Sequence, residues 1–278
     1  MSFSTDVIIL LFSVLAGFLG SILGLGGGII IVPALTLILH LPFQEAIGAS
    51  IVSVIATSSG AAIAYVSDKI TNIRIGMFLE TATTLGAITG AFITGLLNAK
   101  TLYFVFGIFM FYSAWNMFKT RHSSAPSHVS THPLAARLKL NGEYFDKVLN
   151  KTIAYQVAGV YPAYAVMYFA GILSGLLGIG GGAFKVLGMD VFMKLPLKVS
   201  TATSNFMIGV TAAASAGVYF SRGDIDPVIA GPVALGVLAG AHLGAKTLPY
   251  ISNKQLRLLF IPVLVIIAMQ MLWKGWWA

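Results

Sequence analysis

The sequence has no cysteine and very little charge. The absence of cysteine from 278 residues excludes disulfide bonds, thiolate catalysis and zinc or iron–sulfur sites built on cysteine. Charged residues make up only 9% of the chain, against about 25% in an average soluble domain. Hydrophobic residues make up 57%. This composition is typical of a membrane protein and argues against a soluble enzyme.

Four long runs contain no Asp, Glu, Lys or Arg: residues 101–118, 199–221, 227–245 and 258–273. A bilayer core about 30 Å thick is crossed by roughly 20 apolar helical residues, so these runs predict membrane-spanning helices. Residues 1–6 contain no Lys or Arg, and no cleavage site follows them, so we expect the first apolar run to be retained. The expected fold class is an all-α polytopic membrane protein.

Basic residues outnumber acidic ones by 17 to 9, which gives a formal net charge of +8. They fall between the apolar runs rather than along one polar element, which argues against nucleic acid as a partner. The lipid bilayer is the partner that this pattern indicates, and the basic residues serve as signals of orientation. We expect no cofactor and no metal ion, and the sequence leaves a homodimer open.

The chain contains an internal repeat. At an offset of 154 residues, positions 17–91 align without a gap with positions 171–245, and 20 of the 75 pairs are identical. Many identical pairs are Gly or Pro, which chance matches between apolar sequences rarely reproduce. We therefore predict a first transmembrane repeat over 1–118, a polar connector over 119–158 and a second transmembrane repeat over 159–278.

A glycine triplet interrupts the first apolar stretch of each half, at Gly26–Gly28 and at Gly180–Gly182. Each glycine weakens a helix by about 1 kcal/mol relative to alanine, so we expect a helix break, with three spanning helices after it. The broken stretch either crosses the membrane once, which gives parallel repeats, or folds back as a re-entrant hairpin, which gives inverted repeats.

The positive-inside rule separates the two topologies. With Lys185 left out, the Lys and Arg residues of the loops divide 10 to 6 for parallel repeats and 13 to 3 for inverted repeats. The rule favours inverted repeats with a cytoplasmic connector. We expect this connector to be mainly a solvated loop, and a short amphipathic helix around residues 134–149 is the alternative. Inverted repeats whose broken helices meet near the midplane are typical of secondary transporters.

The segments Gly24–Gly28 and Gly178–Gly182, each followed by Leu-Pro and a run of small and hydroxyl residues, resemble the TauE/SafE family of sulfite exporters. The resemblance covers nearly the whole chain outside the connector, and it occurs twice. It implies a bacterial or archaeal inner-membrane permease for sulfite, sulfoacetate or a related organosulfonate. Lys185-Val-Leu187 departs from the first half's Ile31-Val-Pro33, a difference that could separate subgroups with different substrates.

Positions that differ in polarity between the halves are the strongest candidates for chemistry, because a charge in hydrocarbon costs at least about 2.5 kcal/mol. Lys185 follows the second triplet closely, where its ammonium could bind an anion together with free backbone amides. The alternatives are a lysine that extends to the interface or pairs with Asp190. The predicted substrate-binding residues are Gly26, Gly27, Gly28, Gly180, Gly181, Gly182, Lys185, Ser50, Thr201, Thr203, Ser204 and Asn205.

Three titratable residues are candidates for proton coupling: Glu80, His242 and Asp190. Burial of a carboxyl group in a membrane span favours its protonated form, although Glu80 could equally form an ion pair that holds helices together. Histidine titrates near neutral pH, but His242 could instead hydrogen-bond to a neighbouring helix.

The predicted function is secondary transport of a small anion by alternating access. An anion-selective channel is the nearest alternative, and an intramembrane enzyme or a membrane anchor protein are alternatives from other classes. We do not expect an enzyme, because Ser59 lacks the glycine two positions earlier that an intramembrane serine protease would have, and catalysis does not account for the duplication.

Overall fold

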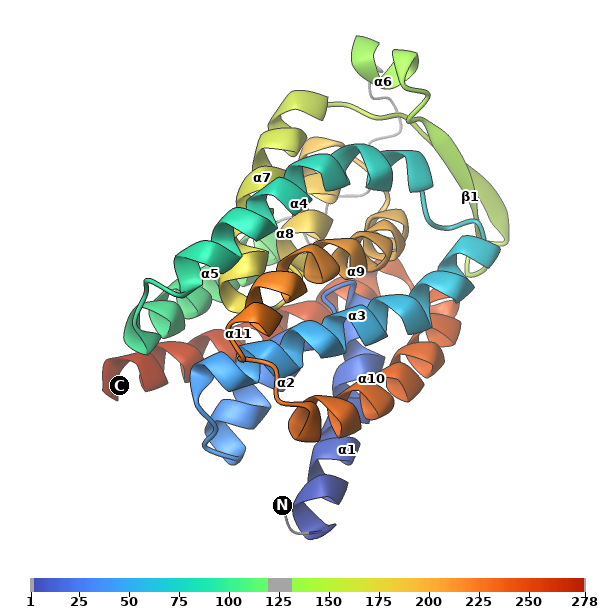
Figure 1. Cartoon of the computed structure of the whole chain (residues 1–278). Helices are drawn as coiled ribbons and strands as arrows, with labels where there is room; N and C mark the ends of the chain where they lie inside the picture. The colour runs from blue at the N-terminus through green and yellow to red at the C-terminus, as the bar shows by residue number, and fades with distance from the viewer. Residues whose placement is uncertain (1–2, 120–131, 278) are drawn as a thin grey trace.

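The computed structural model describes residues 3–119 and 132–277, and the structural statements below concern these residues. The chain is mainly helical (Figure 1). The elements before the connector are α1 (Phe3–Leu23), α2 (Gly28–Pro33), the π-helix η1 (Ala34–Ile38), α3 (Phe43–Ser67), α4 (Ile73–Thr94) and α5 (Ala99–Lys119). The connector contains α6 (Pro133–Arg137), β1 (Gly142–Asp146) and β2 (Lys151–Tyr155).

The elements after the connector are α7 (Val160–Leu177), α8 (Gly182–Leu187), the π-helix η2 (Gly188–Phe192), α9 (Leu197–Ser221), α10 (Pro227–Thr247), the 3₁₀-helix η3 (Leu248–Tyr250) and α11 (Asn253–Trp277). The bounds of α2 and α8, of η1 and η2 and of α3 and α9 differ by 154 residues at both ends. Four described helices are long and apolar enough to cross a membrane: α3, α4, α7, and α10 together with η3.

The predicted helix breaks at the glycine triplets are confirmed. Helix α1 ends before the first triplet and α2 begins at its last glycine, and α7 and α8 flank the second triplet in the same way. Gly26 and Gly180 have φ angles of +70° and +73°, a left-handed conformation that side chains other than glycine's rarely adopt. The glycines therefore end one helix and allow the chain to turn into the next.

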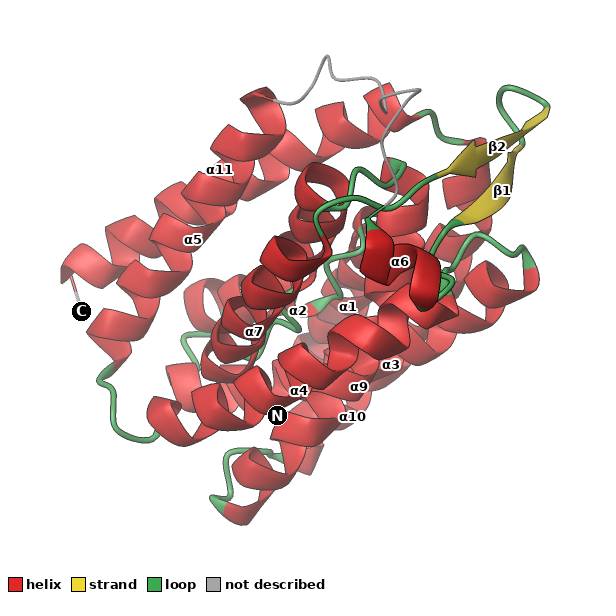
Figure 2. Cartoon of the chain, turned by 90° about the horizontal axis from the view of Figure 1, so that it is seen from above, coloured by secondary structure: helices red, strands yellow, loops and turns green. Residues whose placement is uncertain are grey.

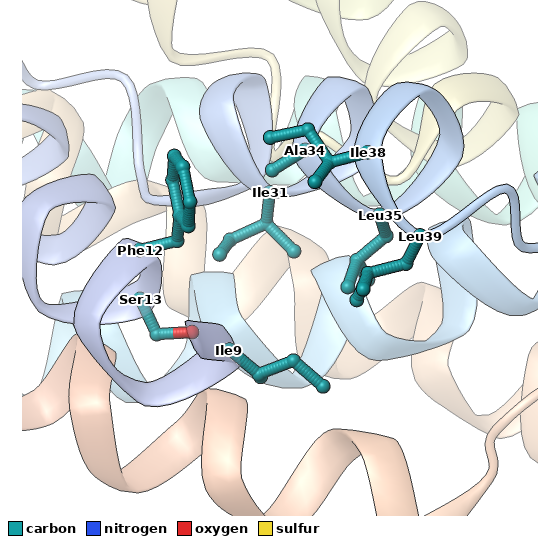
Figure 3. Close-up of a pocket in the computed structure, with 8 residues that line it drawn as sticks. All are labelled: Ile9, Phe12, Ser13, Ile31, Ala34, Leu35, Ile38 and Leu39. Carbon is teal, nitrogen blue, oxygen red and sulfur yellow. The ribbon is translucent and has the colours of Figure 1, made fainter. Parts of the chain in front are cut away.

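Each broken stretch turns back on itself, so that its two ends lie side by side. In the second half, the amide of Ala158 donates to the carbonyl of Met193 at 3.2 Å. In the first half, Ile9 of α1 and Leu39, just after η1, line the same pocket (Figure 3).

The long helices pair across the two halves of the sequence. Helix α1 packs against α10, and α7 packs against α4. Glycine makes these contacts close: a Cβ atom on Gly240 would overlap the backbone of Val14, and one on Gly86 would overlap the backbone of Tyr168. Small residues allow transmembrane helices to approach each other this closely.

Two bundles result, in contact through α3 and α9. The first bundle consists of α1, α2, α3 and α10, and the second bundle consists of α4, α7, α8 and α9. Helices α5 and α11 form an antiparallel pair beside the two bundles, as Figure 2 shows from above. Each bundle therefore contains one broken stretch and helices from both halves.

The connector is not mainly a solvated loop between residues 132 and 158, so that expectation is wrong there. Strands β1 and β2 form an antiparallel hairpin in which Gly142 pairs with Tyr155 and Asp146 with Lys151. The buried carboxylate of Asp146 accepts a hydrogen bond from Lys198 of α9 at 3.1 Å. This partner lies far along the chain, so local sequence did not reveal that the hairpin is anchored.

The hairpin lies on one end of the molecule, here called the connector face (Figure 1). Lys147 forms an ion pair of 3.3 Å with Asp68 at the end of α3. Asn72, which caps α4, donates to the carbonyl of Leu140 at 2.8 Å and to the hydroxyl of Tyr155 at 3.0 Å. The end of α3 and the starts of α4 and α9 therefore all lie at the connector face.

Candidate functional site

The two glycine breaks meet in the interior, each held by a serine from a neighbouring helix. Ser50 of α3 donates to the carbonyl of Gly178 at 2.6 Å, and Ser204 of α9 donates to the carbonyl of Gly24 at 2.7 Å. A Cβ atom on Gly182 would lie 2.6 Å from the Cα of Leu25. The serines thus satisfy carbonyl groups that the breaks free at depth, as a membrane interior requires.

A buried charged cluster lies next to the second break, in the second bundle. The Nζ atom of Lys185 lies 3.6 Å from Oε2 of Glu80 and donates a hydrogen bond to the hydroxyl of Thr211. Thr211 in turn donates to Oε1 of Glu80 at 2.5 Å, and Thr84 donates to the same oxygen at 3.1 Å. We call Lys185, Glu80, Thr211 and Thr84 the charged cluster.

Burial makes this cluster energetically demanding. The exposed fraction is 0% for Lys185 and 5% for Glu80. Removal of one partner of a buried ion pair typically costs about 3–5 kcal/mol, because the other charge is left uncompensated. The carboxylate partner of Lys185 is thus Glu80, from the other half of the sequence. The ion pair considered for Glu80 therefore exists, with Lys185 as its partner.

The equivalent positions in the first bundle carry no charge. At the offset of 154 residues, Lys185 corresponds to Ile31, Glu80 to Ala234 and Thr211 to Thr57. Ile31 lines a pocket whose only polar side chain is Ser13 (Figure 3), and the remaining lining residues are Ile9, Phe12, Ala34, Leu35, Ile38 and Leu39. Among the described residues, the charged cluster therefore occupies only one of two equivalent places.

Two predicted site residues lie at the first break rather than at the charged cluster. Asn205 donates through Nδ2 to the carbonyls of Ser21 at 2.6 Å and Thr201 at 3.2 Å. The Oδ1 atom of Asn205 and the hydroxyl of Thr201 are buried and make no hydrogen bond within the described structure. These two unsatisfied oxygens belong to residues of the predicted binding run itself.

The remaining candidates lie elsewhere. Thr203 accepts a hydrogen bond from the amide of Asn72 at 3.0 Å, at the start of α4. His242 is exposed on α10, away from the buried cluster, and Asp190 is half-buried in η2. Of the three proton-coupling candidates, Glu80 is the one that forms the ion pair of the charged cluster.

The sequence analysis missed Thr211 and Thr84. Thr211 connects Lys185 to Glu80. It is identical to Thr57 at the repeat offset and lies outside the hydroxyl run that follows Leu-Pro, so neither a difference in polarity nor its place in the sequence marked it as a candidate. A threonine one helical turn after Glu80, at Thr84, was a local signal that a carboxylate has a hydroxyl partner on its own helix.

An apolar layer separates the charged cluster from the connector face. Leu79 directly precedes Glu80 on α4, and Met207 precedes Thr211 by one turn on α9; both belong to one buried apolar cluster. That cluster continues through connector residues Leu140 and Val157. It also includes three further methionines, Met167, Met189 and Met193.

The fold and the site define a class: a multi-pass helical membrane protein with two broken helical stretches and a buried ion pair beside one of them. The sulfite exporter TauE/SafE family model matches residues 9–271, and the chain belongs to this family. It is therefore a membrane transporter.

Relatives along the whole chain agree with this assignment. The chain is 28% identical to the "Probable membrane transporter protein YunE" of Bacillus subtilis, over 97% of this chain and 98% of the relative. It is 25% identical to YdhB of the same organism, over 86% and 89% of the two chains. A probable membrane transporter protein of Methanocaldococcus jannaschii is 26% identical, over 93% and 92%. No solved structure matches the chain.

Proposed function

We propose that the protein is a secondary transporter for a small sulfur oxyanion or organosulfonate, such as sulfite or sulfoacetate. The family provides the class of substrate. The observation that carries the proposal is the fully buried ammonium of Lys185, beside a glycine break. A cation held in a low-dielectric interior is an effective ligand for an anion that has left water.

The proposed binding region is the charged cluster together with the glycine breaks and the hydroxyl groups that hold them. Lys185 and Thr211 provide donors, and Ser50 and Ser204 fix the break backbones. Thr203 is not part of the proposed binding region, because its hydroxyl accepts a hydrogen bond from the amide of Asn72. Asn205 and Thr201 contribute unsatisfied oxygens at the first break.

We further propose alternating access by inverted repeats over 1–118 and 159–278, in the inner membrane of a bacterium or archaeon. Support comes from the direction of equivalent helices: α3 ends at the connector face, at Asp68, whereas α9 begins there, at Lys198. Both broken stretches turn back on themselves. The connector, rich in basic residues, would then be cytoplasmic.

The test is thermal stabilisation of the purified protein by sulfite, thiosulfate, sulfoacetate, taurine, sulfate and acetate. A ligand at 100 times its dissociation constant stabilises a folded protein by about 2.7 kcal/mol. We expect one or more sulfur anions to stabilise the wild-type protein and acetate to have less effect.

The site variant is the double substitution Lys185→Ile with Glu80→Ala, which copies the equivalent pair Ile31 and Ala234. Because it removes both charges together, we expect it to fold and to lose the anion response. Lys246→Ala, at an exposed position of α10, controls for loss of one positive charge. An equal response in wild type and the double variant would overturn the assignment of the site.

A further inference from the structure

The charged cluster has the geometry of an anion site that is already filled by a carboxylate of the protein. Lys185 and Thr211 both direct their donors at Glu80. These are the same donors that the proposed function assigns to the substrate. A substrate anion therefore cannot reach them unless Glu80 gives up its place.

The charge balance of the buried cluster determines what must happen to Glu80 when an anion binds. The buried pair of Lys185 and Glu80 is neutral as a unit, and an added anion would leave one uncompensated negative charge in a low-dielectric interior. Protonation of Glu80 removes that charge. The Oε2 atom of Glu80 is buried and makes no hydrogen bond within the described structure, so a proton can bind there without the loss of an existing hydrogen bond.

No other described ion pair involves Glu80. Helix α4 packs against α7 and α9, and Lys185 reaches it from α8. The titratable groups of α7 are the tyrosines Tyr161, Tyr164 and Tyr168. Those of α9 are Lys198, which binds Asp146, and Tyr219, which binds Thr94 and Gly175. Asp190 lies in η2, and Arg74 of α4 donates to Lys139 at the connector face.

We propose that Glu80 is an internal competitor of the substrate, so that one proton binds Glu80 whenever one monovalent anion binds Lys185 and Thr211. The inference rests on the proposed function and adds its coupling. The occupied site then holds Lys185 positive, the anion negative and Glu80 neutral, so its net charge equals that of the empty site. Proton and anion cross together, and transport is electroneutral.

The first experiment measures binding of methanesulfonate and sulfite to wild type and to Glu80→Gln across a range of pH. Methanesulfonate is the salt of a strong acid, so it stays a monoanion and any pH dependence comes from the protein. For wild type, we expect the dissociation constant to rise with pH, by about tenfold per pH unit once Glu80 is ionised in the empty site. For Glu80→Gln, the dissociation constant should not change with pH over the range in which Lys185 keeps its proton, and it should be lower than that of wild type at the upper end of that range.

Two variants control this experiment. Glu45→Gln removes a carboxylate from the first turn of α3 and should behave as wild type. Glu80→Gln combined with Lys185→Met should bind neither probe. The comparison of Glu80→Gln with wild type at one pH also cancels any titration of the probe, which sulfite requires.

The outcomes separate the two proposals. If wild type binds a probe with no pH dependence, or if Glu80→Gln loses binding that wild type retains, Glu80 is not a competitor and only the coupling fails. If neither protein binds either probe, the proposed function fails as well. If Glu80→Gln binds a probe that wild type binds poorly at a pH at which Lys185 keeps its proton, both proposals are supported.

A flux measurement gives an independent readout. In liposomes, an uncoupled monovalent anion would redistribute by about fiftyfold for an imposed potential of about 100 mV. We expect wild-type uptake of the bound probe to respond to a pH gradient and not to such a potential. Uptake that follows the potential would overturn the coupling.

Discussion

Gly182 lies where the two breaks touch, and its surroundings are backbone. A Cβ atom there would lie 2.6 Å from the Cα and 2.9 Å from the carbonyl carbon of Leu25, and backbone atoms cannot rotate away. We expect Gly182→Ala to destabilise the protein by about 1–3 kcal/mol or more, measured by thermal unfolding in detergent. Gly217→Ala is the matched control, because nothing lies within 4 Å of a Cβ atom at that α9 position.

The control should act in the opposite direction. An alanine in a helix interior is more stable than a glycine by about 0.5–1 kcal/mol, so Gly217→Ala should leave stability unchanged or raise it. Equal losses for Gly182→Ala and Gly217→Ala would mean that contact between the breaks does not limit stability.

Because Lys185 and Glu80 form an ion pair, we expect the effects of substituting them on the free energy of unfolding to be strongly non-additive. We expect Lys185→Met alone to cost about 3–5 kcal/mol, because it leaves a buried carboxylate without its cation. Adding Glu80→Gln should restore much of the loss. Unfolding measurements on the wild type, both single variants and the double variant give the coupling between the residues; additive effects would contradict a direct interaction.

At the residue scale, sequence reasoning found charges and missed their connections. Lys185 and Glu80 stood out because an unneeded charge in a membrane is costly. Thr211 did not stand out, because a threonine in a membrane helix usually serves packing or bonds to its own backbone. Thr203 was assigned to the binding run by its neighbours in sequence, whereas its partner Asn72 lies 131 residues away.

At the element scale, the hairpin of β1 and β2 is fixed to the helices by a buried ion pair. Burial by itself raises the pKa of Asp146, but hydrogen bonds from Lys198 and from the amides of Leu149 and Val148, with the charge of Lys198, hold that pKa below its usual value. Because the folded-state pKa is depressed, the ionised carboxylate stabilises the docked hairpin at neutral pH.

The sign of the pH effect follows from this shift. The stabilisation is fully present above the pKa of an unfolded aspartate, about 3.9, and is lost as the pH falls through the lower folded-state pKa. We expect the protection of residues 142–155 against amide exchange, taken relative to the intrinsic exchange rate at each pH, to decrease upon acidification in wild type. Asp146→Asn should be less protected at neutral pH, and its protection should depend less on pH.

Asp68→Asn is the matched control, since it removes an ion pair at the same hairpin whose two side chains are each 36% exposed. Exposed pairs contribute about 0–1 kcal/mol, so this variant should change exchange little. An effect of Asp68→Asn as large as that of Asp146→Asn would show that burial of the Asp146–Lys198 pair does not explain the stability of the docked hairpin.

The elements themselves were predicted unevenly. The breaks at both glycine triplets were predicted correctly, because the conformational cost of consecutive glycines is local. The hairpin was not, because strands of five residues in a polar segment carry a weak signal and depend on an anchor such as Lys198 from another part of the chain.

At the scale of the whole molecule, the charged cluster is closed off from both ends. The methionine-rich layer lies between it and the connector face, and close glycine contacts of α4 with α7 lie beyond it, at Gly86 and Gly90. A buried site must be opened to one side at a time if it is to exchange its anion without a leak.

A closed site predicts carrier kinetics. We expect unlabelled substrate inside liposomes to accelerate uptake of the labelled anion from outside, because a loaded carrier reorients with its substrate. The double variant Lys185→Ile with Glu80→Ala is the inactive control. Uptake that internal substrate does not accelerate, and that does not saturate, would favour the channel.

The exchange of helices between the halves has a consequence for biosynthesis. When the first half leaves the ribosome, α1 has no α10 and α4 has no α7, although these are the partners against which their glycines pack. The early helices must therefore wait in the bilayer as separate segments until the second half is translated. A stalled chain that ends before α7 should be a substrate for membrane proteases, and assembly of both bundles should follow release of the last helices.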